Sequence, residues 1–328
     1  MKELQSLLVS GKPLFITIDG FRQAMLAAFP LNGKTPERPE VKSAFGMTKD
    51  EMLAYLNTHS WYQLESHLAL LDIQKVTNQE NTPITLTDEF SDEQLPDNSI
   101  AYHRVFGTVM SDSYYYFSSK QLQSDLLAAE ANPQISCHFL HVNSPGGEAW
   151  YLDRLSETLR SCEKPILTYY EQTCCSAGYY IGCHGQRVYA RTANDYVGCI
   201  GTMCSFYDFE EYFAKLGIKK VEAKATKSDL KNKVFDDLRK GKDEQFVKDI
   251  LDPMNVQFLS EVRSQRSKIA DLPDDTPVLR GETFYTAQAV ELGLTDGSRT
   301  MGEAISEAVA MANEYTDTKK MKTAIYNI

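Results

Sequence analysis

The sequence contains no apolar run that approaches the ~20 residues required for a membrane-spanning helix. Its N-terminal segment, MKELQSLLVSGKPLFITIDG, is interrupted by polar residues and does not match a secretory signal peptide. Basic residues are outnumbered by acidic ones, 34 against 45, which gives a formal net charge of −11. Such a charge disfavours binding to a nucleic-acid backbone. We therefore expect a cytoplasmic protein, in the cell that makes it, without a membrane span or a nucleic-acid partner.

Cysteine pairs with metal-ligand spacing are also missing. The chain has seven cysteines, an odd number, and none forms a CxxC pair. A disulfide framework is not expected in 328 residues without an export signal. The adjacent Cys174 and Cys175 would point in different directions and could not share a zinc ion. We expect free, buried thiols in a reducing compartment, and neither a metal nor a cofactor.

The first 90 residues have a different character from the rest of the chain. Apolar residues at helical spacing over 49–71 predict helices, and the polar, acidic segment 78–99 predicts a linker. No motif in residues 1–90 points to chemistry, so we interpret them as a mostly helical packing or oligomer-contact region. The overall composition, 42% hydrophobic and 24% charged, is that of a globular protein.

From residue 100 onward, predicted strands alternate with predicted helices. Repeated strand–helix units are typical of an α/β domain with parallel pairing and right-handed crossovers. We expect strands at 136–143, 164–172, 186–190 and 218–225, a turn running into a strand at 196–207, helices at 119–130, 148–162, 174–185, 209–217 and 243–268, and a short strand, helix and turn at 281–297.

Two short motifs carry candidate chemistry. Ser144-Pro145-Gly146-Gly147 follows a predicted buried strand and precedes a predicted helix. Backbone N–H groups in such a glycine loop can stabilise developing negative charge, although the motif alone is equally typical of a plain turn. Ser176 begins an apolar helical segment among small residues. It is a candidate nucleophile, with a helix N-cap as the simpler interpretation.

A serine nucleophile needs a base, and the six histidines offer poor candidates. His184 lies eight residues beyond Ser176, about 12 Å along the same predicted helix. His138 and His141 share one predicted strand, and their odd separation places them on opposite faces. Lysine is the alternative, since burial can lower its pKa and leave it neutral. The candidates are Lys224, Lys227, Lys231 and Lys233.

Taken together, these motifs resemble the signal peptide peptidase A family of Ser-Lys serine peptidases, which includes the protein C-type capsid-maturation peptidases of phages and prophages. The resemblance rests on SPGG, SAGYYI, GCIGT and GETFYTAQAVELGLTDG, and it covers residues 98–298. It implies three parts: an N-terminal region and linker at 1–90, a peptidase domain at 98–298, and a C-terminal helix or tail at 299–328. The implied peptidase fold is a Clp/crotonase-like α/β spiral of β-β-α units.

The same resemblance implies roles for individual residues. Ser176 falls on the nucleophile, and Gly146 and Gly147 fall on the oxyanion loop. The N–H groups of Gly147 and Ala177 are then expected to form the oxyanion hole. Counting forward from Ser176 places the base near position 229, and counting back from the predicted helix at 243–268 places it near 230 or 231.

These counts favour Lys231 over Lys227 as the base, with Ser228 as a residue that orients it. The missing membrane anchor favours the phage type, which acts on capsid or scaffold proteins. The resemblance further implies a homo-oligomeric ring, a peptide or protein substrate, and contacts with portal or capsid proteins. A cysteine nucleophile at Cys174 or Cys175 remains open.

Two alternatives keep the fold and change the function. A crotonase-type acyl-CoA enzyme would use the glycine loop to hold an enolate, with Glu148 as the acidic residue; a first-turn helix acid is the simpler interpretation of Glu148. The other alternative is a catalytically inactive capsid-assembly protein.

Overall fold

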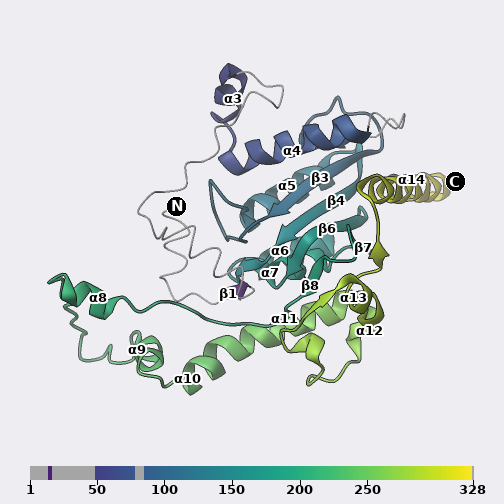
Figure 1. The fold of residues 1–328 in the computed structure, drawn as a ribbon. Coiled ribbons are helices and arrows are strands. Elements are labelled where there is room, and N and C mark those ends of the chain that lie inside the picture. Colours follow the sequence, from purple (N-terminus) through teal and green to yellow (C-terminus); the bar gives the residue numbers. More distant parts are fainter. Residues whose placement is uncertain (1–13, 17–48, 78–84, 327–328) are drawn as a thin grey trace.

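The computed structural model describes residues 14–16, 49–77 and 85–326. Its centre is a sheet with the strand order β10-β7-β6-β4-β3-β2, in which all neighbours run parallel (Figure 1). A further strand, β8, pairs parallel with the end of β6 and antiparallel with β9. The strands are β2 (Leu86–Thr87), β3 (Ser99–Phe106), β4 (Ile135–Ser144), β6 (Ile166–Cys175), β7 (Arg187–Ala190), β8 (Tyr196–Gly198), β9 (Thr283–Tyr285) and β10 (Gly297–Ser298).

Helices connect the central strands and cover one face of the sheet. They are α5 (Ser119–Ala131), α6 (Leu152–Ser161) and α7 (Ala177–Gly182), and α11 (Asp252–Gln265) packs beside them. Side chains alternate between the two faces of a strand, so Leu140 and Val142 of β4 pack under these helices. The α/β fold with parallel pairing that the sequence predicts is confirmed.

The opposite face is covered by the long C-terminal helix α14 (Met301–Tyr326) and by part of α4 (Trp61–Thr77) (Figure 1). Ile305 and Ala308 of α14 are fully buried against aromatic side chains of the strands, such as Phe139 and Tyr169. The segment 301–326 is therefore helical, and its first half belongs to the core. None of the helices in the described part of the chain has the length and apolar character to cross a membrane.

The N-terminal helices are α3 (Lys49–Tyr55) and α4, as the helical spacing predicts. The predicted linker at 78–99 holds a strand instead, since β2 pairs with β3 in parallel at Leu86↔Ile100. Burial of Leu86 against Ile100 favours this pairing over a solvated linker. The division of the chain at residues 90–98 stays a prediction.

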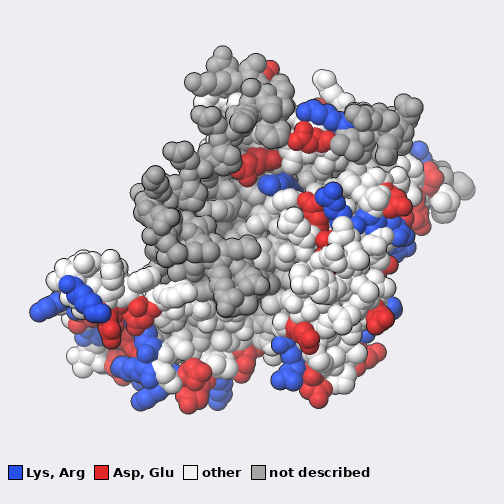
Figure 2. All heavy atoms as spheres, in the orientation of Figure 1, with Lys and Arg blue, Asp and Glu red and all other residues white. Residues whose placement is uncertain are grey.

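An arm of the chain leaves the core between residues 203 and 243 (Figure 1). It carries α8 (Glu210–Lys215) and α9 (Lys233–Arg239). The strand predicted at 218–225 is wrong: these residues form no strand and are exposed, because nothing in the described structure pairs with them. Basic and acidic side chains are interspersed on the arm (Figure 2), with ion pairs such as Lys224–Asp236 at 3.0 Å.

Three other predictions need adjustment at their boundaries. The helix predicted at 148–162 begins only at Leu152, because Gly146–Glu148 forms the short strand β5. The turn running into a strand that is predicted at 196–207 has the reverse order: the strand is Tyr196–Gly198, and residues 199–207 form no further strand. The predicted helix at 243–268 is divided into α10 (Glu244–Phe246), a π-helical turn (Val247–Leu251), α11 and α12 (Ser267–Ala270). A 3₁₀ turn (Pro277–Leu279) precedes β9, and α13 (Thr286–Leu292) follows it.

Candidate active site

Ser176 lies at the junction between the end of β6 and the start of α7. Its backbone has φ 55° and ψ −121°, a positive-φ conformation that residues other than glycine rarely adopt. The residue is fully buried, and its Oγ has no hydrogen-bond partner within the described chain. A strained, unpartnered serine hydroxyl at a strand-to-helix junction is a candidate nucleophile, which would still need a base within hydrogen-bond reach.

Tertiary contacts impose this conformation on Ser176. The residues before it, Cys174 and Cys175, pair with Val197 and Gly198 of β8. The N–H of Ser176 then donates to the carbonyl of Gly198 at 2.8 Å. The chain must turn sharply at Ser176 because the next residue already begins α7. The first-turn N–H of Ala177 has no partner within its own helix, as at any helix N-terminus.

The SPGG loop lies beside this junction, because β4 and β6 are neighbours and Ser144 pairs with Cys174. The hydroxyl of Ser144 donates to the carbonyl of Gly107 at 2.6 Å and accepts the N–H of Gly146 at 3.2 Å. A Cβ at Gly178 would lie 2.9 Å from that of Ser144, so the loop and α7 are in close contact. The structure thus brings Gly146, Gly147, Ser176 and Ala177 together.

Within the loop, Gly147 is the better placed of the two glycines to donate. The N–H of Gly146 is already used by Ser144. The carbonyl of Gly146 and the N–H of Glu148 both bond to Val109, at 3.0 and 2.8 Å. Because successive residues of a strand alternate their hydrogen-bonding edges, the N–H of Gly147 faces the other edge of β5. Sequence reasoning included Ser144 and Gly198 in its motifs but gave neither a role of its own, because their roles are contacts with distant backbone.

The structure keeps every described histidine away from Ser176, whose hydroxyl bonds to none of them. His138 lies on one side of β4, bonded to His103 at 3.0 Å. His141 bonds to the hydroxyl of Tyr102 at 2.9 Å. Burial lowers the pKa of His141 to about 3, so this ring is neutral and structural. A Ser-His pairing is therefore not formed in the described chain.

The predicted lysines lie on the arm and do not reach Ser176 in this structure. Lys227 and Lys231 are both exposed, and Ser228 is half-buried between them. The described lysine whose pKa is lowered is Lys164, where burial brings it to about 8. Lys164 precedes β6, whereas Ser176 follows it, so the strand's length of about 30 Å separates the two. Lys164 instead donates to the carbonyl of Asn132 at 2.7 Å.

The cysteines behave as the sequence predicts, as free thiols. Cys137, Cys174, Cys175 and Cys183 are buried, and the other three are half-buried. Burial raises the pKa of the Cys199 thiol to about 11 and that of Cys175 well above its ordinary value. Neither thiol is ionised near neutral pH, which argues against a cysteine nucleophile beside Ser176.

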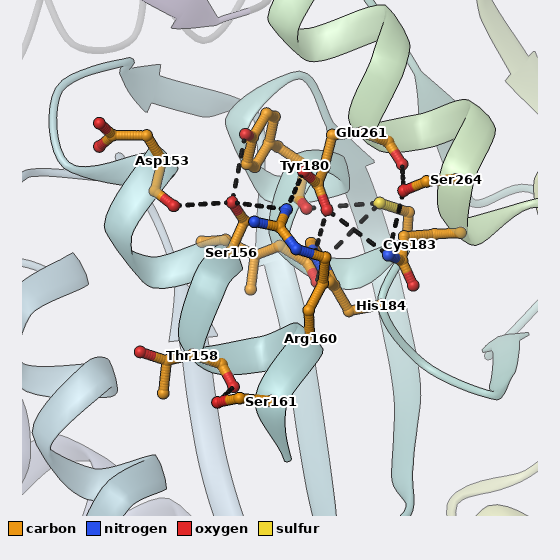
Figure 3. Close-up of polar contacts among 12 residues, drawn as sticks. Asp153, Ser156, Thr158, Arg160, Ser161, Tyr180, Cys183, His184, Glu261 and Ser264 are labelled. Atoms are coloured by element: carbon orange, nitrogen blue, oxygen red, sulfur yellow. Dashed lines mark hydrogen bonds and ion pairs between the residues drawn. The ribbon is translucent and has the colours of Figure 1, made fainter.

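A buried polar network lies behind the nucleophile helix and joins α6, α7 and α11 (Figure 3). Its centre is the carboxylate of Glu261, which accepts from Arg160 and lies 2.9 Å from Nε2 of His184. Nδ1 of His184 lies 3.2 Å from the carbonyl of Ile181. Burial would raise the pKa of Glu261, but the bonds from His184 and Arg160 outweigh it and hold that pKa below its ordinary value. The network fixes α7 against its neighbours.

Two clusters among the described residues have donor atoms within 4.8 Å of one another, as a metal site would. One is Glu130, His138 and Cys162; the other is His67, Asp88 and Glu89. Each already contains a hydrogen-bonded pair, His138–Glu130 at 2.8 Å and His67–Asp88 at 3.0 Å. Neither cluster includes a residue of the Ser176 site.

Glu148, the acid that a crotonase-type reaction would need, is buried and engaged in the loop. Its Oε2 accepts the N–H of Ser111 at 2.9 Å. Glu148 also belongs to β5 rather than to the first turn of a helix. The interpretation of Glu148 as an acid in the first turn of a helix is therefore wrong. Its carboxylate instead holds the Val109–Ser111 segment beside the glycine loop.

Residues 158–314 match the model of peptidase family S49, and this range contains Ser176, both arm lysines and the helix network. This part of the chain, 157 of its 328 residues, is thus similar to the family S49 peptidases. It is 25% identical over 248 residues to Protease 4 of Haemophilus influenzae, covering 70% of this chain and 39% of that protein. It is 23% identical over 245 residues to an Enterococcus faecium protein named as a signal peptide peptidase SppA. That match covers 70% of this chain and 68% of the Enterococcus protein.

The resemblance to the signal peptide peptidase A family is confirmed by these matches, while closeness to the phage proteins stays a prediction. The chain spans about two fifths of the Haemophilus protein's length. Solved structures similar to this chain include a ClpP1 variant from Listeria monocytogenes, with 10% identity, 62% and 94% of the two chains covered and a TM-score of 0.37. An enoyl-CoA hydratase from Polaromonas is 16% identical, with a TM-score of 0.35, and the match covers 61% of this chain and 66% of the hydratase.

Proposed function

We propose that this chain is a serine endopeptidase that cleaves peptide or protein substrates with Ser176 as its nucleophile. The buried, unpartnered hydroxyl of Ser176, beside the glycine loop, carries this proposal. A neutral lysine takes the proton of Ser176 as Oγ attacks the peptide carbonyl, and the N–H groups of Gly147 and Ala177 hold the oxyanion. The lysine returns the proton to the leaving amine, and water then hydrolyses the acyl-enzyme with the same lysine as base.

The base in this proposal is Lys231, with Lys227 as the alternative. Lys220, Lys224 and Lys233 of the arm are held in ion pairs. The hydrogen bonds that Lys224 donates to Asp236 and Glu222 raise its pKa, which disfavours a neutral amine there. Among the described residues, no ion pair holds Lys227 or Lys231. Either is available for transfer into an apolar site, where desolvation lowers a lysine pKa.

We further propose that the arm delivers this lysine to Ser176 of a second copy of the chain. The arm exposes apolar side chains that a partner would cover: Tyr212, Leu216, Ile218, Val221 and Leu230 are 57–92% exposed. Ser176 lacks a base from its own described chain. Assembly would bury the arm and complete the site at the same time. A homo-oligomer, a ring by resemblance to the family, follows from this arrangement.

The test is intact-mass spectrometry after incubation with a fluorophosphonate probe. We expect one adduct in the wild type, none in Ser176→Ala, and at least about 100-fold slower labelling in Lys231→Ala, the low end for loss of a general base. Lys219→Ala is the matched control. Loss of labelling in Lys227→Ala instead would identify Lys227 as the base. No adduct in a folded, assembled wild type would favour either a site that is closed by the chain itself or an inactive assembly protein.

Mixing two variants tests delivery of the lysine between copies. Ser176→Ala retains its lysines and Lys231→Ala retains its serine, so a mixed oligomer rebuilds one complete site if the pair comes from different chains. We expect labelling on the Lys231→Ala chain only after mixing. No recovery in a mixed oligomer would mean that both residues act within one chain. Cytosolic location and capsid, scaffold or portal partners stay predictions.

A further inference from the structure

A short segment from near the N-terminus lies on the glycine loop. Residues Leu14–Ile16 form the strand β1, which pairs antiparallel with β5 (Gly146–Glu148) in a two-stranded sheet. The register places Phe15 opposite Gly147 and Ile16 opposite Gly146. β1 also contacts α7, the helix that follows Ser176 (Figure 1). The segment therefore contacts both the glycine loop and the nucleophile helix.

The pairing engages the group that catalysis needs. One edge of β5 is held by Val109, through the carbonyl of Gly146 and the N–H of Glu148. The N–H and carbonyl of Gly147 are thus on the edge that β1 covers. Phe15 is the residue directly opposite, so its backbone and that of Gly147 face each other as donor and acceptor. The proposed oxyanion donor is covered by the chain's own backbone.

We propose that Leu14–Ile16 is an autoinhibitory strand, which occupies the peptide-binding edge of β5 and must leave before a substrate enters. This inference rests on the proposed function of Ser176. An extended peptide that adds to a sheet edge is held by main-chain hydrogen bonds, so a substrate and β1 would compete for the same backbone groups. The strand is three residues long, and displacement by a longer peptide costs few hydrogen bonds.

The test removes one backbone donor from β1. Phe15→Pro lacks the N–H that faces Gly147, whereas Phe15→Ala keeps it and serves as the matched control. We expect fluorophosphonate labelling of Ser176 to accelerate about fivefold or more in Phe15→Pro, as loss of one backbone hydrogen bond predicts. A synthetic peptide of residues 11–19 should slow that labelling again, and the same peptide with proline in place of Phe15 should not.

A second readout does not depend on catalysis. Hydrogen exchange of the Gly147 amide should be faster in Phe15→Pro than in wild type and Phe15→Ala. Suppose that the Gly147 amide exchanges faster in Phe15→Pro but that none of the three proteins is labelled at Ser176. That result would support the covering of Gly147 by β1 and would overturn the proposal of a serine peptidase. A Phe15→Pro protein whose labelling and exchange both equal those of Phe15→Ala would show that β1 does not guard the site.

Discussion

The backbone N–H of Ser176 donates to the carbonyl oxygen of Gly198 at 2.8 Å. This bond ties the candidate nucleophile to the GCIGT segment, 22 residues further along the chain. Gly198 itself has φ 115°, and a Cβ there would approach the carbonyl of Glu282 to 2.8 Å. Gly198 adopts this conformation without strain because it has no Cβ, whereas Ser176 is strained at φ 55°. The backbone strain therefore lies on the residue of the proposed chemistry.

The first prediction concerns the left-handed backbone of Ser176. Ser176→Gly should stabilise the fold by about 1–2 kcal/mol, because glycine adopts this conformation without strain. Ser176→Ala should leave stability near that of wild type, since its Cβ retains the strain. Both variants should lose hydrolysis of a peptide substrate. Thermal unfolding measures the change in stability, and intact-mass labelling measures the loss of the reactive serine. Equal melting temperatures of Ser176→Gly and Ser176→Ala would contradict the strain at Ser176.

The second prediction concerns the space around Gly147. A Cβ there would lie 2.1 Å from the carbonyl oxygen of Val109, so Gly147→Ala must displace the loop backbone. We expect kcat/KM to fall by about 10²-fold or more, as for loss of one oxyanion donor. The control is Gly107→Ala, whose Cβ would meet nothing within 4 Å and whose cost is backbone strain at φ 77°. Steady-state kinetics on both variants decides, and equal kcat/KM values would exclude a role for the loop.

The third prediction concerns the network around Glu261. Glu261→Gln leaves Arg160 without its ion pair and should destabilise the fold by about 1–3 kcal/mol. Because the folded-state pKa of Glu261 lies below its ordinary 4.5, its contribution is present above that pH and is lost as the pH falls through the folded pKa. Denaturant unfolding should show a smaller difference from wild type at pH 3.5 than at pH 7. Glu157→Gln, exposed on α6, is the control.

The fourth prediction concerns the buried histidines of β3 and β4. Burial lowers the pKa values of His103, His138 and His141 below the ordinary 6.5. The unfolded chain then binds more protons below pH 6.5, so stability is fully present above that pH and falls below it. For His141, with a pKa of about 3, the loss at pH 5 is about 2 kcal/mol. His141→Gln should lose stability less steeply between pH 7 and pH 5 than wild type.

The measurement for this fourth prediction is the midpoint of denaturant unfolding as a function of pH. His59→Gln, outside the sheet at the end of α3, should follow the wild-type pH profile. A His141→Gln profile as steep as that of wild type would assign the acid sensitivity to other groups.

The local pattern of the sequence predicts the central sheet well. β4 and β6 are buried on both faces and have strand-forming, largely apolar sequences, so 136–143 and 164–172 are recognisable without knowledge of their neighbours. The segment 218–225 is a contrasting case. All of its residues are exposed, and a strand there would need a partner that the described chain does not supply.

The sequence by itself determined the α/β alternation and the residues of the candidate site, since the serine, the glycines and the small residues around them are properties of local segments. Only the tertiary structure decided the conformation of Ser176, the use of the Gly146 N–H by Ser144, and the distance of the lysine arm from the core. Strand pairing and loop contacts join residues far apart in the chain, and their energies depend on neighbours that no local pattern specifies. The pairing of β1 with β5 is the clearest case, because 129 or more residues separate partners that lie in direct register.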